Sequence, residues 1–345
     1  MVPQLISFDQ TYRLVTRSDF DGLVCAALLK ELGILEEILF VHPKDVQDGK
    51  VALTAKDITT NLPYRPEVAL AFDHHSSEQH RVRNDAENRV LAADADSAAR
   101  VVYDYFGGAA RFPRVSVAMM EAVDRADAAR LSMQDIIDPQ GWIFLSFLMD
   151  PRTGLGRFRD FRISNYQLML QLIDRCVELP IEEILASPDV SERVALYREH
   201  ADAAVEQIRR CSTLQGDVLV LDLRDEDVIH PTNRFLLYAA YPRCRVSIHV
   251  LWGLRQQNTV FAVGRSILDR SSRRDIGALM LAHGGGGHEA AGTCQIANDQ
   301  AEVVLAELVQ TLADGEPATI SASGGGVGGP EAEPSATATA STPTW

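Results

Sequence analysis

Residues 13–32 have the sequence RLVTRSDFDGLVCAALLKEL, and this stretch decides the fold class. Its first six residues predict a short buried strand that brings Asp19 and Asp21 to its carboxyl end. Gly22 then opens a helix with apolar periodicity that runs to Leu32. A strand followed by an acidic turn and a helix is typical of an α/β domain built on a parallel sheet.

Further apolar runs predict neighbouring strands of the same sheet. One lies at 38–41, a second at 51–55 leads to Asp57, and a third at 68–72 leads directly into DHH at 73–75. In open α/β sheets the ligand crevice lies outside the carboxyl ends of the strands. We therefore expect these polar residues to meet at one edge of the N-terminal sheet.

The length of 345 residues favours two domains, since a domain has on average roughly 150 residues. We expect an N-terminal parallel-sheet domain at 1–190 that carries the chemistry, a connecting helix at 191–212 and a smaller mixed α/β domain at 213–315. Residues 316–345 are rich in Gly, Ser, Ala, Thr and Pro, and we expect them to be disordered because they offer little apolar surface.

Composition narrows the class of protein. Hydrophobic residues make up 46% of the chain, and its five cysteines form no C-x-x-C pair, so we expect buried reduced thiols. The N-terminus has no unbroken apolar stretch and no run reaches membrane-spanning length, which favours the cytoplasm and excludes a membrane partner. The net charge of -15 disfavours long duplex nucleic acid, because such binding relies on Lys and Arg.

Carboxylates and histidines at the strand ends indicate a metal site. Adjacent carboxylates repel each other unless a cation lies between them, and Mg2+ or Mn2+ prefers carboxylate oxygen, with imidazole tolerated by Mn2+. The alternative for Asp19 and Asp21 is a capping and turn role, and for Asp57 or Asp127 taken alone it is a solvated surface carboxylate.

The two consecutive histidines differ in expected role. Successive residues of an extended segment point in opposite directions, so one of the two faces the carboxylates if the strand continues. We expect His74 to bind metal and His75 to lie nearer the substrate. The alternative is a pair of satisfied histidines in the core or at the surface.

A glycine run indicates a second binding element. It comprises Gly284, Gly285, Gly286 and Gly287, followed by His288, and it lies between an amphipathic helix and a strand. Successive free N–H groups in such a loop form an anion-binding concavity. Arg265 and Ser266 could add a guanidinium and a hydroxyl to the same phosphate, although a surface ion pair is the alternative for Arg265.

Taken together, these motifs resemble the DHH phosphoesterase superfamily with its associated C-terminal domain. The resemblance rests on SDFDG, FDHH, DRAD, GRSIL and GGGGHEAAGTCQI, which occur in the family's order across about residues 13–296. It implies a hydrolase of phosphoric ester bonds with two metal ions, usually Mn2+, for which Mg2+ or Co2+ can substitute.

The resemblance also implies roles for individual residues. Asp19 would bind one ion, Asp21 and His74 the other, and Asp57 would bridge both and orient the attacking water. The last ligand is the aspartate of DRAD, either Asp124 or Asp127, and we favour Asp127. Many members have a histidine four residues before the first aspartate, where this chain has Val15. His75 would protonate the leaving oxygen, and the second domain would hold the remote part of the substrate.

The substrates of this superfamily range from oligonucleotides to polyphosphate. The acidic composition favours a short oligonucleotide or a small nucleotide, with an exopolyphosphatase-like activity as the alternative. A different class, a non-catalytic nucleotide or phosphate sensor with a degraded first metal site, is suggested by Val15. The sequence allows a homodimer.

Overall fold

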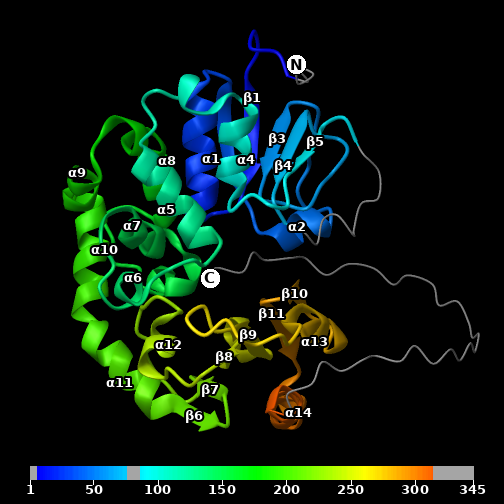
Figure 1. Cartoon of the computed structure of the whole chain (residues 1–345), viewed down its shortest axis with the longest axis vertical. Coiled ribbons are helices and arrows are strands. Elements are labelled where there is room, and N and C mark those ends of the chain that lie inside the picture. Colours follow the sequence, from blue (N-terminus) through cyan, green and yellow to red (C-terminus); the bar gives the residue numbers. More distant parts are fainter. Residues whose placement is uncertain (1–5, 76–85, 314–345) are drawn as a thin grey trace, which may run out of the picture. The chain divides into compact units, whose positions relative to one another are not determined.

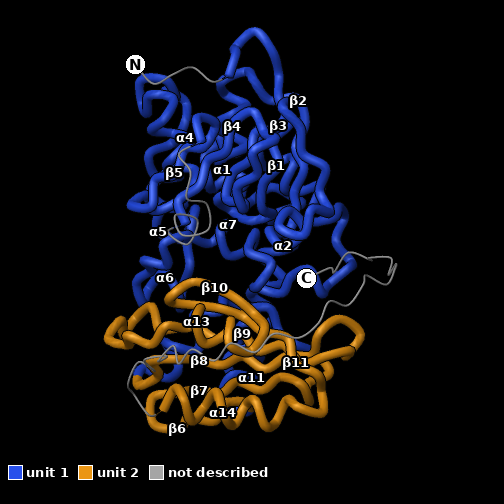
Figure 2. The backbone as a smooth tube through the Cα atoms, turned by 90° about the vertical axis from the view of Figure 1, so that its right-hand side faces the viewer, with its two compact units in different colours: residues 1–210, 228–242 blue, residues 211–227, 243–345 orange. Residues whose placement is uncertain are grey.

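The computed structural model describes residues 6–75 and 86–313, which form two compact units (Figures 1 and 2). Unit 1 comprises Met1–Arg210 and Val228–Pro242, and unit 2 comprises Cys211–Asp227 and Arg243–Trp345. Residues 228–242 thus belong to the first unit, whereas the sequence places them in a second domain at 213–315. The tail at 316–345 lies outside the described residues.

Unit 1 is built on a five-stranded sheet in the order β2-β1-β3-β4-β5, in which all neighbours are parallel. The strands are β1 (Tyr12–Thr16), β2 (Leu35–Phe40), β3 (Asp57–Thr60), β4 (Leu70–Asp73) and β5 (Arg89–Leu91). The helices are α1 (Phe20–Glu31), α2 (Pro43–Gln47), α4 (Ala98–Tyr105), α5 (Val117–Asp127), α6 (Met133–Ile137), α7 (Gly141–Met149), α8 (Asn165–Glu178), α9 (Ile181–Ala186), α10 (Pro188–Glu199), α11 (Ala201–Cys211) and α12 (Leu236–Ala240). The predicted α/β class with a parallel sheet is confirmed.

Helix α1 is the buried centre of unit 1. Its residues from Phe20 to Leu29 are all buried, as expected for a helix that is apolar on most sides. Asp19 caps it, because the Asp19 carboxylate accepts a hydrogen bond from the Gly22 amide at 3.0 Å. A Cβ atom at Gly22 would lie 2.1 Å from the Arg17 carbonyl oxygen, so this tight turn requires glycine.

One predicted strand of unit 1 is wrong. Residues 51–55 form no strand, and β3 begins at Asp57 instead of ending there. The parallel register pairs Arg13 with Asp57 and Leu14 with Ile58, so Asp57 lies where β1 and β3 both start. Asp57 is therefore at the amino edge of the sheet, away from the carboxyl ends where the ligand crevice was expected.

The connector predicted at 191–212 consists of two helices. Helix α10 ends at Glu199 and α11 begins at Ala201, with His200 between them. The His200 ring packs 5.1 Å from the Phe158 ring, and its Nδ1 lies 2.7 Å from Nδ1 of His230, all within unit 1.

Unit 2 contains a six-stranded mixed sheet in the order β10-β11-β9-β8-β7-β6. The strands are β6 (Ser212–Gln215), β7 (Val218–Asp222), β8 (Val246–Trp252), β9 (Thr259–Arg265), β10 (Gly286–His288) and β11 (Ala291–Ile296), with helices α13 (Ile276–Ala282) and α14 (Ala301–Ala313). Strands β7 and β8 are parallel, and the other neighbours are antiparallel. Apolar side chains of β8, β9, α13 and α14 form its core, which confirms the predicted mixed α/β class.

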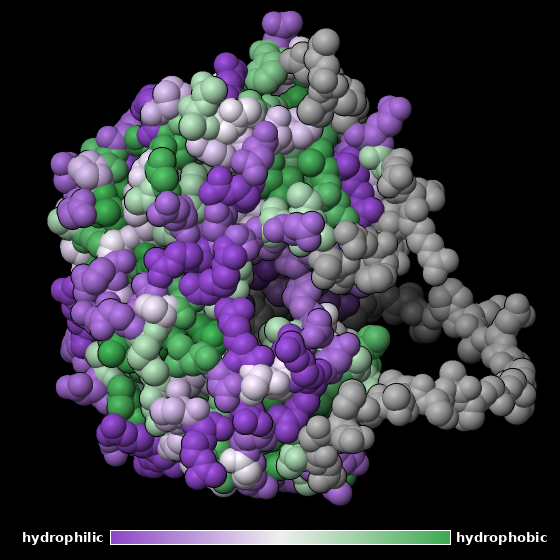
Figure 3. Space-filling model, in the orientation of Figure 1, coloured by the Kyte–Doolittle hydropathy of each residue, from purple (hydrophilic) through white to green (hydrophobic). Residues whose placement is uncertain are grey.

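The surface fits a chain with a net charge of -15. On the face shown in Figure 3, hydrophilic residues predominate and hydrophobic ones occupy smaller areas between them. Within the described residues, every helix is too short or too polar to cross a membrane.

Candidate metal centre

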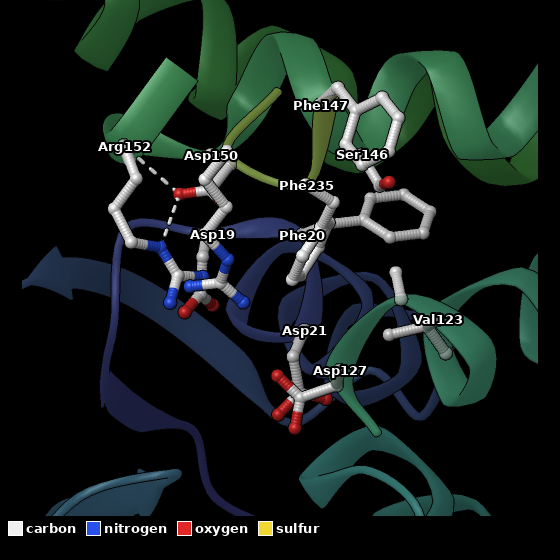
Figure 4. A pocket seen from close by; sticks show the side chains of 12 residues that line it. Asp19, Phe20, Asp21, Val123, Asp127, Ser146, Phe147, Asp150, Arg152 and Phe235 are labelled. Carbon is white, nitrogen blue, oxygen red and sulfur yellow. Dashed lines mark hydrogen bonds and ion pairs between the residues drawn. The ribbon is translucent and has the colours of Figure 1, made fainter. Parts of the chain in front are cut away.

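Three predicted ligands converge at the carboxyl edge of the unit 1 sheet. Asp21 follows β1 in the first turn of α1, His74 follows β4, and Asp127 is the last residue of α5. One ligand atom from each of the three lies within 4.8 Å of the others. Figure 4 shows the Asp21 and Asp127 carboxylates facing each other.

Asp21 is held rigidly in a buried position. Its carboxylate accepts hydrogen bonds from the amides of Ala98 and Ala99 at 3.1 and 2.8 Å, and from Asn61 Nδ2 at 2.9 Å. Burial raises the pKa of Asp21 well above its usual value, and the negative charges of Asp127 and Asp19 raise it further. Asn61 was not predicted as a site residue; it follows β3 at the position where Asp57 was expected to supply a strand-end ligand.

His74 has the orientation of a metal-binding imidazole. Its Nδ1 lies 3.2 Å from the Ala95 carbonyl oxygen, to which it can donate, and its Nε2 lies 2.9 Å from Asp127 Oδ2. A hydrogen bond at one ring nitrogen leaves the other as the ligand. Burial lowers the pKa of His74, but the hydrogen bond to Asp127 and the charges of Asp127 and Asp21 outweigh burial and raise it to about 9.

The pKa of Asp127 is shifted in the opposite direction to that of His74. Burial alone disfavours its ionisation, but the hydrogen bond and the charge of His74 dominate and lower the pKa of Asp127. Asp124 is engaged elsewhere, since its carboxylate accepts from Ser97 Oγ at 2.7 Å and from Arg100 at 3.0 Å. The geometry therefore brings Asp127, and not Asp124, into the cluster.

Two carboxylates and one imidazole fit a divalent cation. The donor set combines the oxygen ligands that Mg2+ and Mn2+ prefer with a nitrogen that Mn2+ tolerates. The raised pKa of Asp21 shows that a second ionised carboxylate beside Asp127 is unfavourable in the metal-free protein, and a bound cation would relieve this repulsion.

Asp19 lies in the same pocket but has partners within the chain. One carboxylate oxygen caps α1, and the other lies 3.2 Å from Arg17 Nε. Val15, at the position where many DHH proteins have a histidine, is fully buried and packs with Val46 and Leu62. No metal donor is present at that position of β1.

The expected bridging role of Asp57 is not supported by its place in the fold. Arg13 donates to both Asp57 oxygens, with Nε–Oδ1 and Nη2–Oδ2 distances of 2.7 and 3.0 Å, and the Thr54 amide donates to Oδ2 at 2.6 Å. The carboxylate is thus neutralised by Arg13 at the amino edge of the sheet, and it is not part of the cluster of Asp21, His74 and Asp127.

His75 contacts its own neighbour. Its Nδ1 lies 2.7 Å from Asp73 Oδ1, and its ring centroid lies 4.5 Å from that of His74. The Asp73 carboxylate also accepts from the His74 amide at 2.9 Å, so one carboxylate orients the chain at the end of β4.

The glycine run of unit 2 is partly a strand. Gly286–His288 form β10, which pairs with β11, so the predicted open loop is wrong for these residues. A Cβ atom at Gly285 or Gly287 would lie 2.1 Å from the Thr293 oxygen or 2.3 Å from the Ala291 oxygen. Glycine at these two positions is explained by the close hairpin, whereas a Cβ at Gly286 would meet nothing within 4 Å.

The side chains predicted beside the glycine run have partners within unit 2. Arg265 Nη1 donates to Glu289 Oε1 at 3.0 Å. This is the kind of surface ion pair that was the alternative for Arg265. Ser266 is buried, and its Oγ accepts from the amides of Leu268 and Asp269 at 3.3 and 3.1 Å. Its hydroxyl closes the turn that follows β9.

Two arginines of the metal-site pocket were not predicted from the sequence. Arg152 and Arg234 line the same pocket as Asp19, Asp21 and Asp127 (Figure 4 labels Arg152). Burial lowers the pKa of Arg152, but the charges of Asp150, Asp19 and Asp127 outweigh it and raise the pKa. No local motif marks these arginines, because they come from distant parts of the chain.

Comparison with known proteins finds similar solved structures. The chain is similar to the solved structure of the pGpG-specific phosphodiesterase PggH from Vibrio cholerae, with 52% sequence identity and a TM-score of 0.76, over 89% of this chain and 100% of that one. RecJ from Thermus thermophilus in complex with Mn2+ matches at 14% identity and a TM-score of 0.45, over 88% of this chain and 52% of that one. No protein-family profile and no curated protein sequence matches the chain.

The fold and the site define a hydrolase of phosphoric ester bonds with a divalent-metal centre. The whole-length match at 52% identity shows the family, and the chain belongs to the DHH phosphoesterase superfamily.

Proposed function

We propose that this chain hydrolyses the phosphodiester bond of short 5'-phosphorylated oligonucleotides, with pGpG as the leading substrate. The observation that carries the proposal is the whole-length similarity, at 52% identity, to a pGpG-specific phosphodiesterase. The cluster of Asp21, His74 and Asp127 supports it, because a dinucleotide diester needs charge neutralisation at phosphorus. Neither polyphosphate hydrolysis nor a sensor role has a comparable observation in its favour.

Asp21, His74 and Asp127 are proposed to hold the catalytic metal, and Asp19 to hold a second ion once Arg17 turns aside. We propose Mn2+, with Mg2+ or Co2+ as substitutes, because one ligand is an imidazole. A divalent ion bound there would act as a Lewis acid toward the phosphoryl oxygen and would lower the pKa of a bound water. The amides of Ala98 and Ala99 fix the Asp21 carboxylate, so the ligand geometry is set before substrate binds.

His75 is proposed to protonate the leaving oxygen. Asp73 Oδ1 lies 2.7 Å from His75 Nδ1 and thereby orients the ring. The proton would then leave from Nε2. A general acid of this kind typically contributes a factor of about 100 to 10,000 in rate.

Unit 2 is proposed to bind the part of the substrate remote from the cleaved bond. Gly286 supports this role, because open space surrounds its Cα while its neighbours Gly285 and Gly287 are fully explained by hairpin packing. Its backbone can therefore approach a ligand closely. Arg265 and His288 are proposed to contact the substrate beside it, and Ser266 to hold the adjoining turn.

The test is a substrate panel with purified full-length protein. We expect Mn2+-dependent release of GMP from pGpG, slower cleavage of a five-residue RNA, and none of polyphosphate. EDTA should abolish turnover, and the count of Mn2+ bound per chain would show whether Asp19 holds a second ion. Preferred hydrolysis of polyphosphate, or tight pGpG binding without turnover at saturating Mn2+, would overturn the proposal in favour of one of the two alternatives.

A further inference from the structure

Arg152 is fixed at the wall of the metal-site pocket by its own turn. It lies in the 3-10 turn Pro151–Thr153, where Asp150 Oδ1 accepts from the Arg152 amide at 2.9 Å and from its Nε at 2.8 Å. This contact uses one edge of the guanidinium. Figure 4 shows the guanidinium beside Asp19, apart from the facing carboxylates of Asp21 and Asp127.

Arg234 reaches the same pocket from the segment Val228–Pro242. The Thr232 amide donates to the Thr153 carbonyl at 3.1 Å, and Asn233 Nδ2 donates to the Ile136 carbonyl at 2.9 Å. These two bonds hold the residues just before Arg234, and the first of them joins this segment to the turn that carries Arg152. The fold of unit 1 therefore brings the two arginines to the same pocket, although they are far apart in sequence.

Arg234 is partly buried, and within the part of the chain that the structure describes one nitrogen of its guanidinium group is left without an acceptor. Its Nε is buried and, among the described residues, finds no hydrogen-bond acceptor. Its guanidinium packs over the Phe235 ring with 4.5 Å between Cζ and the ring centroid. Buried polar groups in proteins are almost always hydrogen-bonded, so an unsatisfied donor in a pocket indicates an acceptor supplied by a ligand.

The charge of the pair selects the kind of acceptor. A phosphate monoester carries close to two negative charges at neutral pH, whereas a diester carries one. Guanidinium groups bind phosphate through two parallel N–H bonds, and two of them match a dianion. A divalent ion held by Asp21, His74 and Asp127 would neutralise the diester at the cleaved bond instead.

We infer that Arg152 and Arg234 form a binding site for the terminal phosphate monoester of the substrate. The inference rests on the proposed function, in which that group is the 5'-phosphate of pGpG. The site requires a chain end next to the metal cluster, and it thereby favours short substrates. Both arginines contact the substrate and leave the chemistry at the cleaved phosphorus to the metal ligands.

The experiment compares pGpG with GpG, which lacks the terminal phosphate, in wild-type protein and in Arg234→Gln and Arg152→Gln. We expect kcat/KM for pGpG to fall at least tenfold in each variant, mainly through KM, while the value for GpG changes less than threefold. Arg114→Gln is the matched control, because Arg114 is an exposed arginine of unit 1 paired with Glu31 at 3.4 Å. It should behave as wild type with both substrates.

A binding measurement separates this inference from the proposed function. Calorimetry in EDTA should show that wild-type protein binds 5'-GMP more tightly than guanosine, and that Arg234→Gln loses the difference. Equal losses on pGpG and GpG, or 5'-GMP binding that is unchanged in both arginine variants, would overturn the site. If wild-type protein binds 5'-GMP through these arginines but cleaves no pGpG, the phosphate site stands and the proposed substrate is wrong.

Discussion

Asp21 and Asp57 are both buried carboxylates of the unit 1 sheet, with exposed fractions of 2% and 1%, yet their surroundings are opposite. Asp57, at the amino edge, has its own cation, because Arg13 donates to both of its oxygens. Asp21, at the carboxyl edge, faces the Asp127 carboxylate, and its hydrogen-bond donors among the described residues are amide N–H groups.

The difference shows how to separate a structural carboxylate from a functional one. A buried charge must be compensated, and the protein either supplies the counter-charge or leaves it to a ligand. Asp57 is an example of the first case and Asp21 of the second. Burial and residue type alone do not distinguish the two, whereas the neighbouring charges do.

The largest expected effect is on catalysis, in Asp21→Asn. We expect kcat/KM for pGpG to fall by a factor of about 1,000 or more, about 4 kcal/mol of barrier, because a neutral amide is a poor metal ligand. In EDTA its thermal stability should change less than that of Asp57→Asn, since a neutral amide avoids the burial cost and the repulsion by Asp127 that raise the pKa of Asp21, and this offsets the altered amide contacts. Steady-state kinetics and melting curves measure both effects, and retention of a tenth of the rate would exclude Asp21 as a ligand.

Asp57→Asn should give the reverse pattern. It leaves Arg13 without its charged partner, and we expect a loss of about 2 to 3 kcal/mol in the free energy of unfolding by urea. The kcat/KM of the protein that remains folded should stay within about threefold of wild type. Arg13→Gln is the matched change and should cost a similar amount. A tenfold loss of activity without loss of stability would instead indicate that Asp57 takes part in metal binding.

Metal binding should sharpen the comparison further. Mn2+ at 100 times its Kd should stabilise wild-type protein and Asp57→Asn by about 2.7 kcal/mol, and Asp21→Asn hardly at all. Differential scanning calorimetry with and without Mn2+ measures this. Equal stabilisation of Asp21→Asn would show that the ion binds elsewhere.

The same binding should depend on pH. The usual pKa of histidine is 6.5, but in the metal-free protein that of His74 is raised to about 9, so the ring is protonated below that pH and must lose its proton to the metal. Apparent Mn2+ affinity should therefore fall by up to about tenfold per pH unit as the pH drops from 9 toward 7. Calorimetry in buffers of different ionisation enthalpy counts the released protons, and a pH-independent affinity with none released would contradict the assignment of His74.

The smallest expected change in stability is that of Gly286→Ala. Space is open around its Cα, so the free energy of unfolding should change by less than about 0.5 kcal/mol, while KM for pGpG rises several-fold. Gly285→Ala is the contrasting change, because its Cβ would lie 2.1 Å from the Thr293 oxygen and should destabilise unit 2. If both variants bind substrate normally, the hairpin has no role in binding.

Most of the carboxyl edge was predictable from local sequence. The turn at Asp19 and Asp21 follows an apolar strand and precedes an apolar helix, and His74 follows another strand, so the parallel sheet brings them together. Position within the DRAD motif also favoured Asp127 over Asp124 as the metal ligand. In the structure the Asp124 carboxylate accepts hydrogen bonds from Ser97 and Arg100 instead.

The error at Asp57 has a physical cause. The run at 51–55 is more apolar than the strand that follows it, and β3 contains Thr59 and Thr60, which are buried but polar. Burial of the Thr60 hydroxyl is possible because it has a partner on β1, in the 2.7 Å bond from Thr60 Oγ1 to Thr16 Oγ1. Such tertiary compensation is invisible in a window of sequence, and so is the meeting of Arg152 with Arg234.

The return of Val228–Pro242 to unit 1 also governs the order in which the nascent chain can fold. Asn233 is buried and donates to the Ile136 carbonyl and to Tyr197 Oη, so unit 1 cannot complete its interior until this segment has been translated. By then the ribosome has already made β6 and β7 of unit 2. N-terminal domains commonly fold first during synthesis, but here the first unit must wait for a piece of chain encoded within the second.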